Sequence, residues 1–127
     1  MDLKEWKKLA EQEVYRYRDS KAYVQGVLDS GGAGGEKMRQ RARWVLAIEY
    51  VKEHLERTDP QKAYVFTALF GLDSPLRAKR QARTVVELSI ELHVSTTAIY
   101  QWKSEMLSLV LLAAAQTGAM RMYRIET

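Results

Sequence analysis

The stretch that decides the fold is Thr84–Ala115, with the sequence TVVELSIELHVSTTAIYQWKSEMLSLVLLAAA. Its apolar residues recur at three- and four-residue spacing on both sides of a short turn, which predicts a short helix, a turn and a longer helix. Ser89 supplies the small side chain that a close crossing needs, and Ser95 stands at the N-cap of the second helix. The apolar side chains expected in the core between the two helices are Leu88, Leu92, Val94, Ile99 and Trp102. This layout is typical of a helix-turn-helix, which places one helix in the major groove of DNA.

The predicted second helix begins with polar residues on its outer face. Glutamine can pair with adenine, threonine can bond a base edge or touch a thymine methyl, and tyrosine or serine can reach a phosphate. Lys103 is expected on a phosphate. The residues expected to contact double-stranded DNA in this helix and at its cap are Ser95, Thr96, Thr97, Tyr100, Gln101 and Lys103, with Ser104 on the same outer face.

His93 and Trp102 each have two interpretations. His93 occupies the turn position that tends to need a positive φ, so it is either a turn residue in a slightly strained conformation or a phosphate or pH-dependent contact. Trp102 could stack on a base, but its spacing with Ile99 and Met106 favours the core. We expect a structural role for both.

Two runs of basic residues carry no acid. The first lies directly before the predicted helix-turn-helix and consists of Arg77, Lys79, Arg80 and Arg83, which we expect to contact DNA phosphates. The second consists of Lys37, Arg39, Arg41 and Arg43. Both runs have the alternative interpretation of a solvated surface, which carries more weight for the second.

Composition sets the class of protein. With 127 residues, of which 46% are hydrophobic and 28% charged, and a net charge of +4, the chain is expected to be an ordinary globular protein. The absence of cysteine excludes disulfides and thiolate zinc sites. We found neither a membrane-length apolar run nor a signal peptide, so we expect a cytoplasmic protein of a bacterial host that does not bind a membrane.

The remaining sequence is helical nearly throughout, which predicts an all-α helical bundle with a C-terminal helix-turn-helix. Residues 1–35 are expected to form an amphipathic helix, with a break near Asp19–Ser20, followed by the glycine-rich hinge Asp29–Gly35. Residues 36–118 are expected to form the helical domain that contains the helix-turn-helix (84–115), and 119–127 a tail. Inside it, Thr58-Asp59-Pro60 predicts a helix start, while Gly71 and Gly118 predict helix ends.

Catalytic and cofactor motifs are missing from the sequence. His54 and His93 lie in different predicted elements, and there is no Walker A, GxGxxG, GxSxG or HExxH pattern. We therefore expect neither an enzyme nor a cofactor or metal.

The segment GEKMRQRARWVLAIEYVKEHLERTDPQKAYVFTALFGL, followed by VVELSIELHVSTTAIYQWKSEMLSLV, resembles the RinA-type and ArpU-type phage transcriptional regulators. Their C-terminal helix-turn-helix is similar to region 4 of bacterial sigma factors. The resemblance covers roughly 36–112. It implies that the protein activates late, packaging or integrase genes, and that the residues that bind promoter DNA are Ser95, Thr96, Thr97, Tyr100, Gln101 and Lys103. The sequence differs from the family pattern in two places: the basic connector 72–83 is long, and His93 occupies the turn.

Two other functions stay open at this point. A phage small terminase subunit also combines a helix-turn-helix with helical oligomerisation segments, although usually in the opposite order. A helical module that binds polymerase or a sigma factor without reading DNA is the second. The last helix is apolar on more than one face, so we expect burial by the N-terminal helices or by another chain in a homodimer or higher oligomer, and contact with host RNA polymerase is a further expected partnership.

Overall fold

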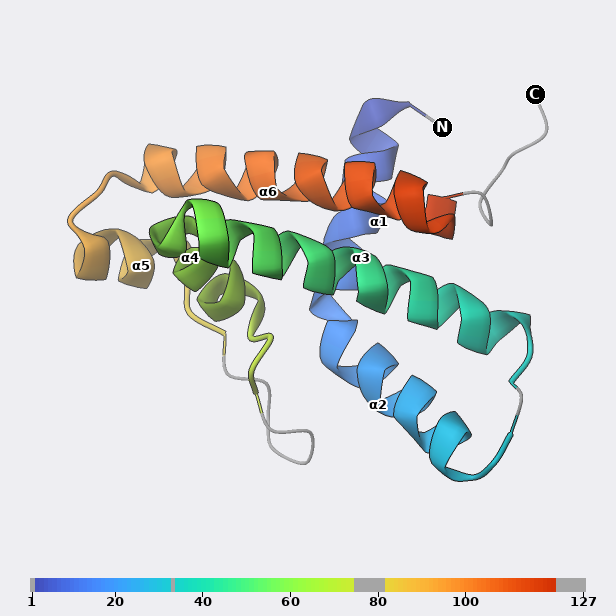
Figure 1. Ribbon diagram of the computed structural model, residues 1–127. Helices are drawn as coiled ribbons and strands as arrows, with labels where there is room; N and C mark the ends of the chain where they lie inside the picture. The colour runs from blue at the N-terminus through green and yellow to red at the C-terminus, as the bar shows by residue number, and fades with distance from the viewer. Residues whose placement is uncertain (1, 33, 75–81, 121–127) are drawn as a thin grey trace.

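In a computed structural model, the chain is all-helical over the residues that the structure describes, which are 2–32, 34–74 and 82–120 (Figure 1). The helices are α1 (Leu3–Tyr15), α2 (Tyr17–Asp29), α3 (Glu36–Thr58), α4 (Pro60–Phe70), α5 (Val85–Leu92) and α6 (Thr96–Thr117). The predicted all-α class is therefore confirmed. Within these residues, no helix combines the length and the apolar character that crossing a membrane requires.

Helix ends lie where the capping residues predict them. The side chain of Asp59 accepts a hydrogen bond from the backbone N–H of Lys62 at 3.2 Å, and Pro60 takes the first helical position of α4. Gly71 ends α4 with φ 63° and Gly118 ends α6 with φ 85°, both in the left-handed region that glycine adopts without strain. These three boundaries are decided by local chemistry.

The core lies where α3 and α6 run side by side in opposite directions, with α1 crossing behind them (Figure 1). Trp44 of α3, Phe66 of α4 and Met106 of α6 are among its largest fully buried side chains. Ala10 and Val14 of α1 belong to the same buried cluster. The apolar last helix is thus covered largely by helices of its own chain, as one of the two sequence-based alternatives expected.

The chain changes direction between α1 and α2 at Arg16, not near Asp19–Ser20 as predicted. Ser20 lies inside α2 and is buried, with its hydroxyl accepting a hydrogen bond from the Arg41 guanidinium at 3.0 Å. The prediction was wrong because the break is set by tertiary contacts. α1 packs on α6, whereas α2 packs on α3.

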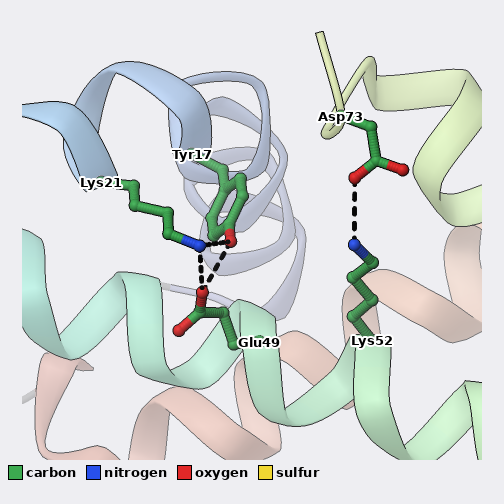
Figure 2. A network of polar contacts seen from close by, with 5 residues as sticks. All are labelled: Tyr17, Lys21, Glu49, Lys52 and Asp73. Carbon is green, nitrogen blue, oxygen red and sulfur yellow. Dashed lines mark hydrogen bonds and ion pairs between the residues drawn. The ribbon is translucent and has the colours of Figure 1, made fainter. Parts of the chain in front are cut away.

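A polar network fixes α2 against α3 (Figure 2). The Tyr17 hydroxyl donates to a Glu49 carboxylate oxygen at 2.7 Å, and the Lys21 ammonium lies 3.0 Å from the same oxygen. Burial and the hydrogen bond to Glu49 raise the pKa of Tyr17 to about 12. Burial alone would raise the pKa of Glu49, but the bonds from Tyr17 and Lys21 outweigh it, so this pKa lies below its ordinary value. Beside the network, Lys52 pairs with Asp73 at 3.0 Å and joins α3 to the turn after α4.

Candidate nucleic-acid interface

Helices α5 and α6 are joined by a turn of three residues, His93 to Ser95. Both ends of α5 and the start of α6 are capped. Thr84 and Glu87 form a capping box at the start of α5, with reciprocal side chain to backbone hydrogen bonds of 3.1 Å. At its end, the N–H of Val94 donates to the carbonyl of Ser89 at 3.1 Å, while His93 adopts φ 56° and ψ 41°. This pattern is a Schellman ending with histidine in the usual place of glycine, and it confirms His93 as a turn residue with positive φ.

The predicted core of this helix pair is confirmed. Leu88 and Ile99 are fully buried, and Leu92, Val94 and Trp102 are partly buried against the same cluster. Ser89 is buried as well, and its hydroxyl donates to the carbonyl of Val86. The hydroxyl of Ser95 accepts a hydrogen bond from the N–H of Ala98 at 3.0 Å, which caps the first turn of α6 as predicted. Capping and burial together fix the direction in which α6 leaves the turn.

The start of α6 presents a polar surface to solvent. Its exposed side chains, which we call the recognition face, are Ser95, Thr96, Thr97, Tyr100, Gln101 and Ser104. Tyr100 is 58% exposed although it carries a large ring. None of the six residues is acidic, and the exposed carboxylate that follows them, Glu105, pairs with Lys62 of α4 at 3.0 Å. Five of the six candidate contacts predicted in this helix and at its cap therefore share one surface.

Lys103, the sixth, lies elsewhere on α6. Its side chain is 20% exposed, and its ammonium group lies 3.1 Å from a carboxylate oxygen of Glu11 in α1 and 5.9 Å from the centre of the Phe70 ring. Because the Glu11 carboxylate already balances its charge, Lys103 is a weak candidate for a phosphate contact. It holds α1 across α6 instead.

That crossing brings a residue to the recognition face that the sequence pattern did not indicate. The Lys7 ammonium of α1 donates to the Ser104 hydroxyl at 2.9 Å. The two residues are 97 positions apart, so no local spacing could have predicted the contact. Lys7 adds a positive charge at the edge of an otherwise uncharged surface.

The predicted basic contacts divide into three groups. Arg83 is half-exposed, and its guanidinium pairs with Glu91 at 2.8 Å and Glu87 at 3.4 Å, so α5 carboxylates already balance its charge. Arg77, Lys79 and Arg80 lie outside the described residues. In the second run, Lys37 and Arg41 stack over the ring of Tyr23, 4.9 and 5.9 Å from its centre. These contacts join α2 to α3 and do not involve α6, which carries the recognition face.

No arrangement for metal binding occurs in the part of the chain that the structure describes: no three histidine or carboxylate side chains come together there. His54 lies on α3 and His93 in the turn before α6, in separate elements as predicted. An open depression of about 490 Å³ lies beside α4 and is lined by residues that include Lys52, Tyr64 and Asp73.

Comparison with known proteins identified no relative of this chain. The chain matches no protein-family model, and neither the curated proteins nor the solved structures searched include a similar one.

Proposed function

We propose that the protein is a sequence-specific double-stranded DNA-binding regulator of transcription that inserts the start of α6 into the major groove. The observation that carries the proposal is the recognition face, an acid-free polar surface on the first turns of a helix whose direction is fixed by capping and burial. Hydrophobic contacts from Ile99 and Trp102 hold the opposite side of the same turns, whereas Thr97, Tyr100 and Gln101 are exposed on the outer side. A rigid helix with such a face is what direct base recognition requires.

The side chains divide into base contacts and phosphate contacts. Gln101 and Thr97 are the candidates for base edges, since an amide can bond adenine bidentately and a threonine methyl can touch thymine. Ser95, at the cap beside the free N–H groups of α6, suits a phosphate, because a helix N-terminus favours negative charge. Lys7 lies at the other edge of the face and supplies a charge for the backbone of the same groove.

The biological role rests on the resemblance to RinA-type and ArpU-type regulators. By that resemblance, the target would be a phage promoter that controls late, packaging or integrase genes, with host RNA polymerase as a second partner. The proposed mechanism requires no cofactor, because recognition uses hydrogen bonds and apolar contacts from the protein alone.

Selection of binding sites from random duplex DNA tests the proposal. We expect the wild-type protein to enrich one sequence motif, and Gln101→Ala to lose about 1–3 kcal/mol of binding to it and to relax specificity at one base pair. Gln61→Ala is the matched control, because Gln61 is exposed at the start of α4 and makes no part of the recognition face.

The joint replacement of Thr96, Thr97, Tyr100 and Gln101 by alanine gives the decisive outcome. All four side chains are exposed or surface-facing, so the variant should keep the far-ultraviolet circular dichroism of the wild type. A folded variant that still binds the selected site with undiminished affinity would refute DNA recognition by α6. Enrichment of no motif by the wild-type protein would favour a module that binds protein instead.

A further inference from the structure

A second exposed surface lies between α3 and α6 and carries large apolar side chains at its centre. Leu46 and Tyr50, one helical turn apart on α3, are 58% and 53% exposed, and Leu112 on α6 is 64% exposed. Two shallow depressions of about 350 and 180 Å³ hollow the surface between them. We call the central part of this surface, formed by Leu46, Tyr50, Leu109, Leu112 and Gln116, the α3–α6 apolar face; the polar side chains of Glu49, Glu53, His54 and Thr117 also line the two depressions. Exposed apolar side chains that adjoin one another on neighbouring helices are typical of an interaction site.

None of the helices in the described part of the chain covers this face. At 100° per residue, Leu112 lies about 180° around α6 from Lys103, the residue that pairs with Glu11 of α1. Figure 1 shows α1 crossing behind α3 and α6, with no helix drawn in front of the middle of that pair. α1 therefore covers one side of α6, and the apolar face is the opposite side.

We infer that the α3–α6 apolar face binds the same face of a second copy of this chain in a two-fold symmetric dimer. The inference rests on the proposed function for its geometry, since a dimer that binds DNA must present both recognition faces to the same side. A two-fold axis that lies in the interface, at right angles to α6, brings α3 against α3 and α6 against α6, each pair antiparallel.

The direction of the recognition face fits that axis. Around α6, the mean direction of Thr97, Tyr100, Gln101 and Ser104 lies roughly 100° from the mean direction of Leu109, Leu112 and Gln116, as the 100° turn per residue sets it. The recognition face therefore points nearly along the proposed axis, and a rotation about that axis leaves its direction unchanged. Both copies then face one DNA duplex.

The spacing along α6 fits as well. The centres of these two sets are twelve residues apart, which is about 18 Å at a rise of 1.5 Å per residue. Antiparallel α6 helices that meet at the apolar face would hold their recognition faces about 36 Å apart. One turn of DNA separates half-sites by about 34–36 Å.

Charge on α3 favours a second copy over an unrelated apolar partner. When α3 pairs with itself antiparallel so that Leu46 meets Tyr50, the residues three positions outside that pair, Arg43 and Glu53, also come opposite each other. Both ends of the contact would then combine a basic with an acidic side chain. In the same register Arg39 comes opposite Arg57, and both are exposed and of like charge, so the favourable charge pairing is limited to Arg43 and Glu53.

Sedimentation equilibrium of the full chain tests the interface. We expect the wild type to form a dimer, and Leu112→Asp to raise its dissociation constant roughly ten-fold or more, since a carboxylate at the centre of the face would be buried without a partner. Tyr50→Lys on α3 should weaken the dimer too. Leu28→Asp is the matched control, because Leu28 is 54% exposed on α2, away from the apolar face, and it should leave the dimer unchanged. A monomeric wild type, a ring of many subunits, or a dimer that both Leu112→Asp and Tyr50→Lys leave intact would overturn the inference.

A DNA measurement separates this inference from the proposed function. On the motif selected by the wild type, the dimer should bind two inverted half-sites one turn apart far more tightly than one, whereas Leu112→Asp should bind both DNAs alike and retain the affinity for a single half-site. A dimer that Leu112→Asp dissociates but that enriches no DNA motif would leave the interface standing and overturn the proposed function. Equal binding of the wild type to one and two half-sites would overturn the inference alone.

Discussion

Two bends in this chain are made by different means. The α5–α6 turn is held by residues close in sequence: the backbone hydrogen bond from Val94 to Ser89, the left-handed His93, and the cap at Ser95. The α1–α2 bend at Arg16 has no side-chain cap at the start of α2 and is held by contacts from α3, chiefly Glu49 on Tyr17 and Arg41 on Ser20.

The difference explains why the first bend could be predicted and the second could not. Caps and turn residues act over three to five positions, so their signals are visible in the sequence. A bend that depends on residues more than twenty positions away leaves no such signal. The two bends should also respond differently to substitution.

The largest expected effect breaks the α5–α6 pair at its core. Ile99 is fully buried beneath the turn, and Ile99→Ala should lower the free energy of unfolding by about 2–5 kcal/mol, because the cavity cannot be refilled. Chemical denaturation measures this value. Tyr100→Ala, one residue further on and exposed, is the control and should stay within about 0.5 kcal/mol of the wild type. Similar losses for both variants would contradict the assignment of the buried and exposed sides of α6.

A smaller effect is expected at the α1–α2 bend. Tyr17→Phe removes the hydrogen bond to Glu49 and should cost about 1 kcal/mol at neutral pH, given that the carboxylate is partly exposed. Urea denaturation of the variant and of wild type provides the comparison. No loss of stability would mean that packing alone sets the bend.

The same hydroxyl predicts a pH dependence with a definite sign. The pKa of Tyr17 is raised to about 12 in the folded protein, whereas an unfolded tyrosine titrates near 10. The folded state therefore keeps a proton that the unfolded state loses, so this stability is present below pH 10 and is lost as the pH rises from 10 to 12. The free energy of unfolding of Tyr17→Phe should fall less steeply between pH 10 and 12 than that of the wild type. Lys21, whose pKa is also raised by its bond to Glu49, accounts for a remaining fall.

The smallest expected effect has the opposite sign. His93 has φ 56°, so His93→Gly should relieve strain and raise stability by about 0.5 kcal/mol after the greater freedom of glycine in the unfolded chain is deducted. Thermal unfolding would detect it as a small rise in Tm. Arg16→Gly is the matched substitution at the other bend. Because φ is −90° there, nothing is relieved, and we expect a loss; stabilisation by both variants would remove the distinction between the bends.

The candidate site shows the same division between local and distant information. Sequence spacing placed Thr97, Tyr100 and Gln101 on one surface, because a helix of 3.6 residues per turn whose inner side is fixed by Ile99 and Trp102 leaves its outer side determined. It also grouped Lys103 with them. The structure turns Lys103 toward Glu11 and brings Lys7 to Ser104 instead, and both outcomes depend on where α1 crosses α6.

Local sequence signals were enough to predict the all-α class, the ends of α3, α4 and α6, and the capped α5–α6 turn. In each case the deciding residues lie within one or two helical turns of each other. The bend at Arg16, the partners of Lys7 and Lys103, and the apolar face that α3 and α6 share depend instead on how the helices pack together. A helix carries its own hydrogen bonds and caps, but which of its faces is covered depends on segments far away in the chain.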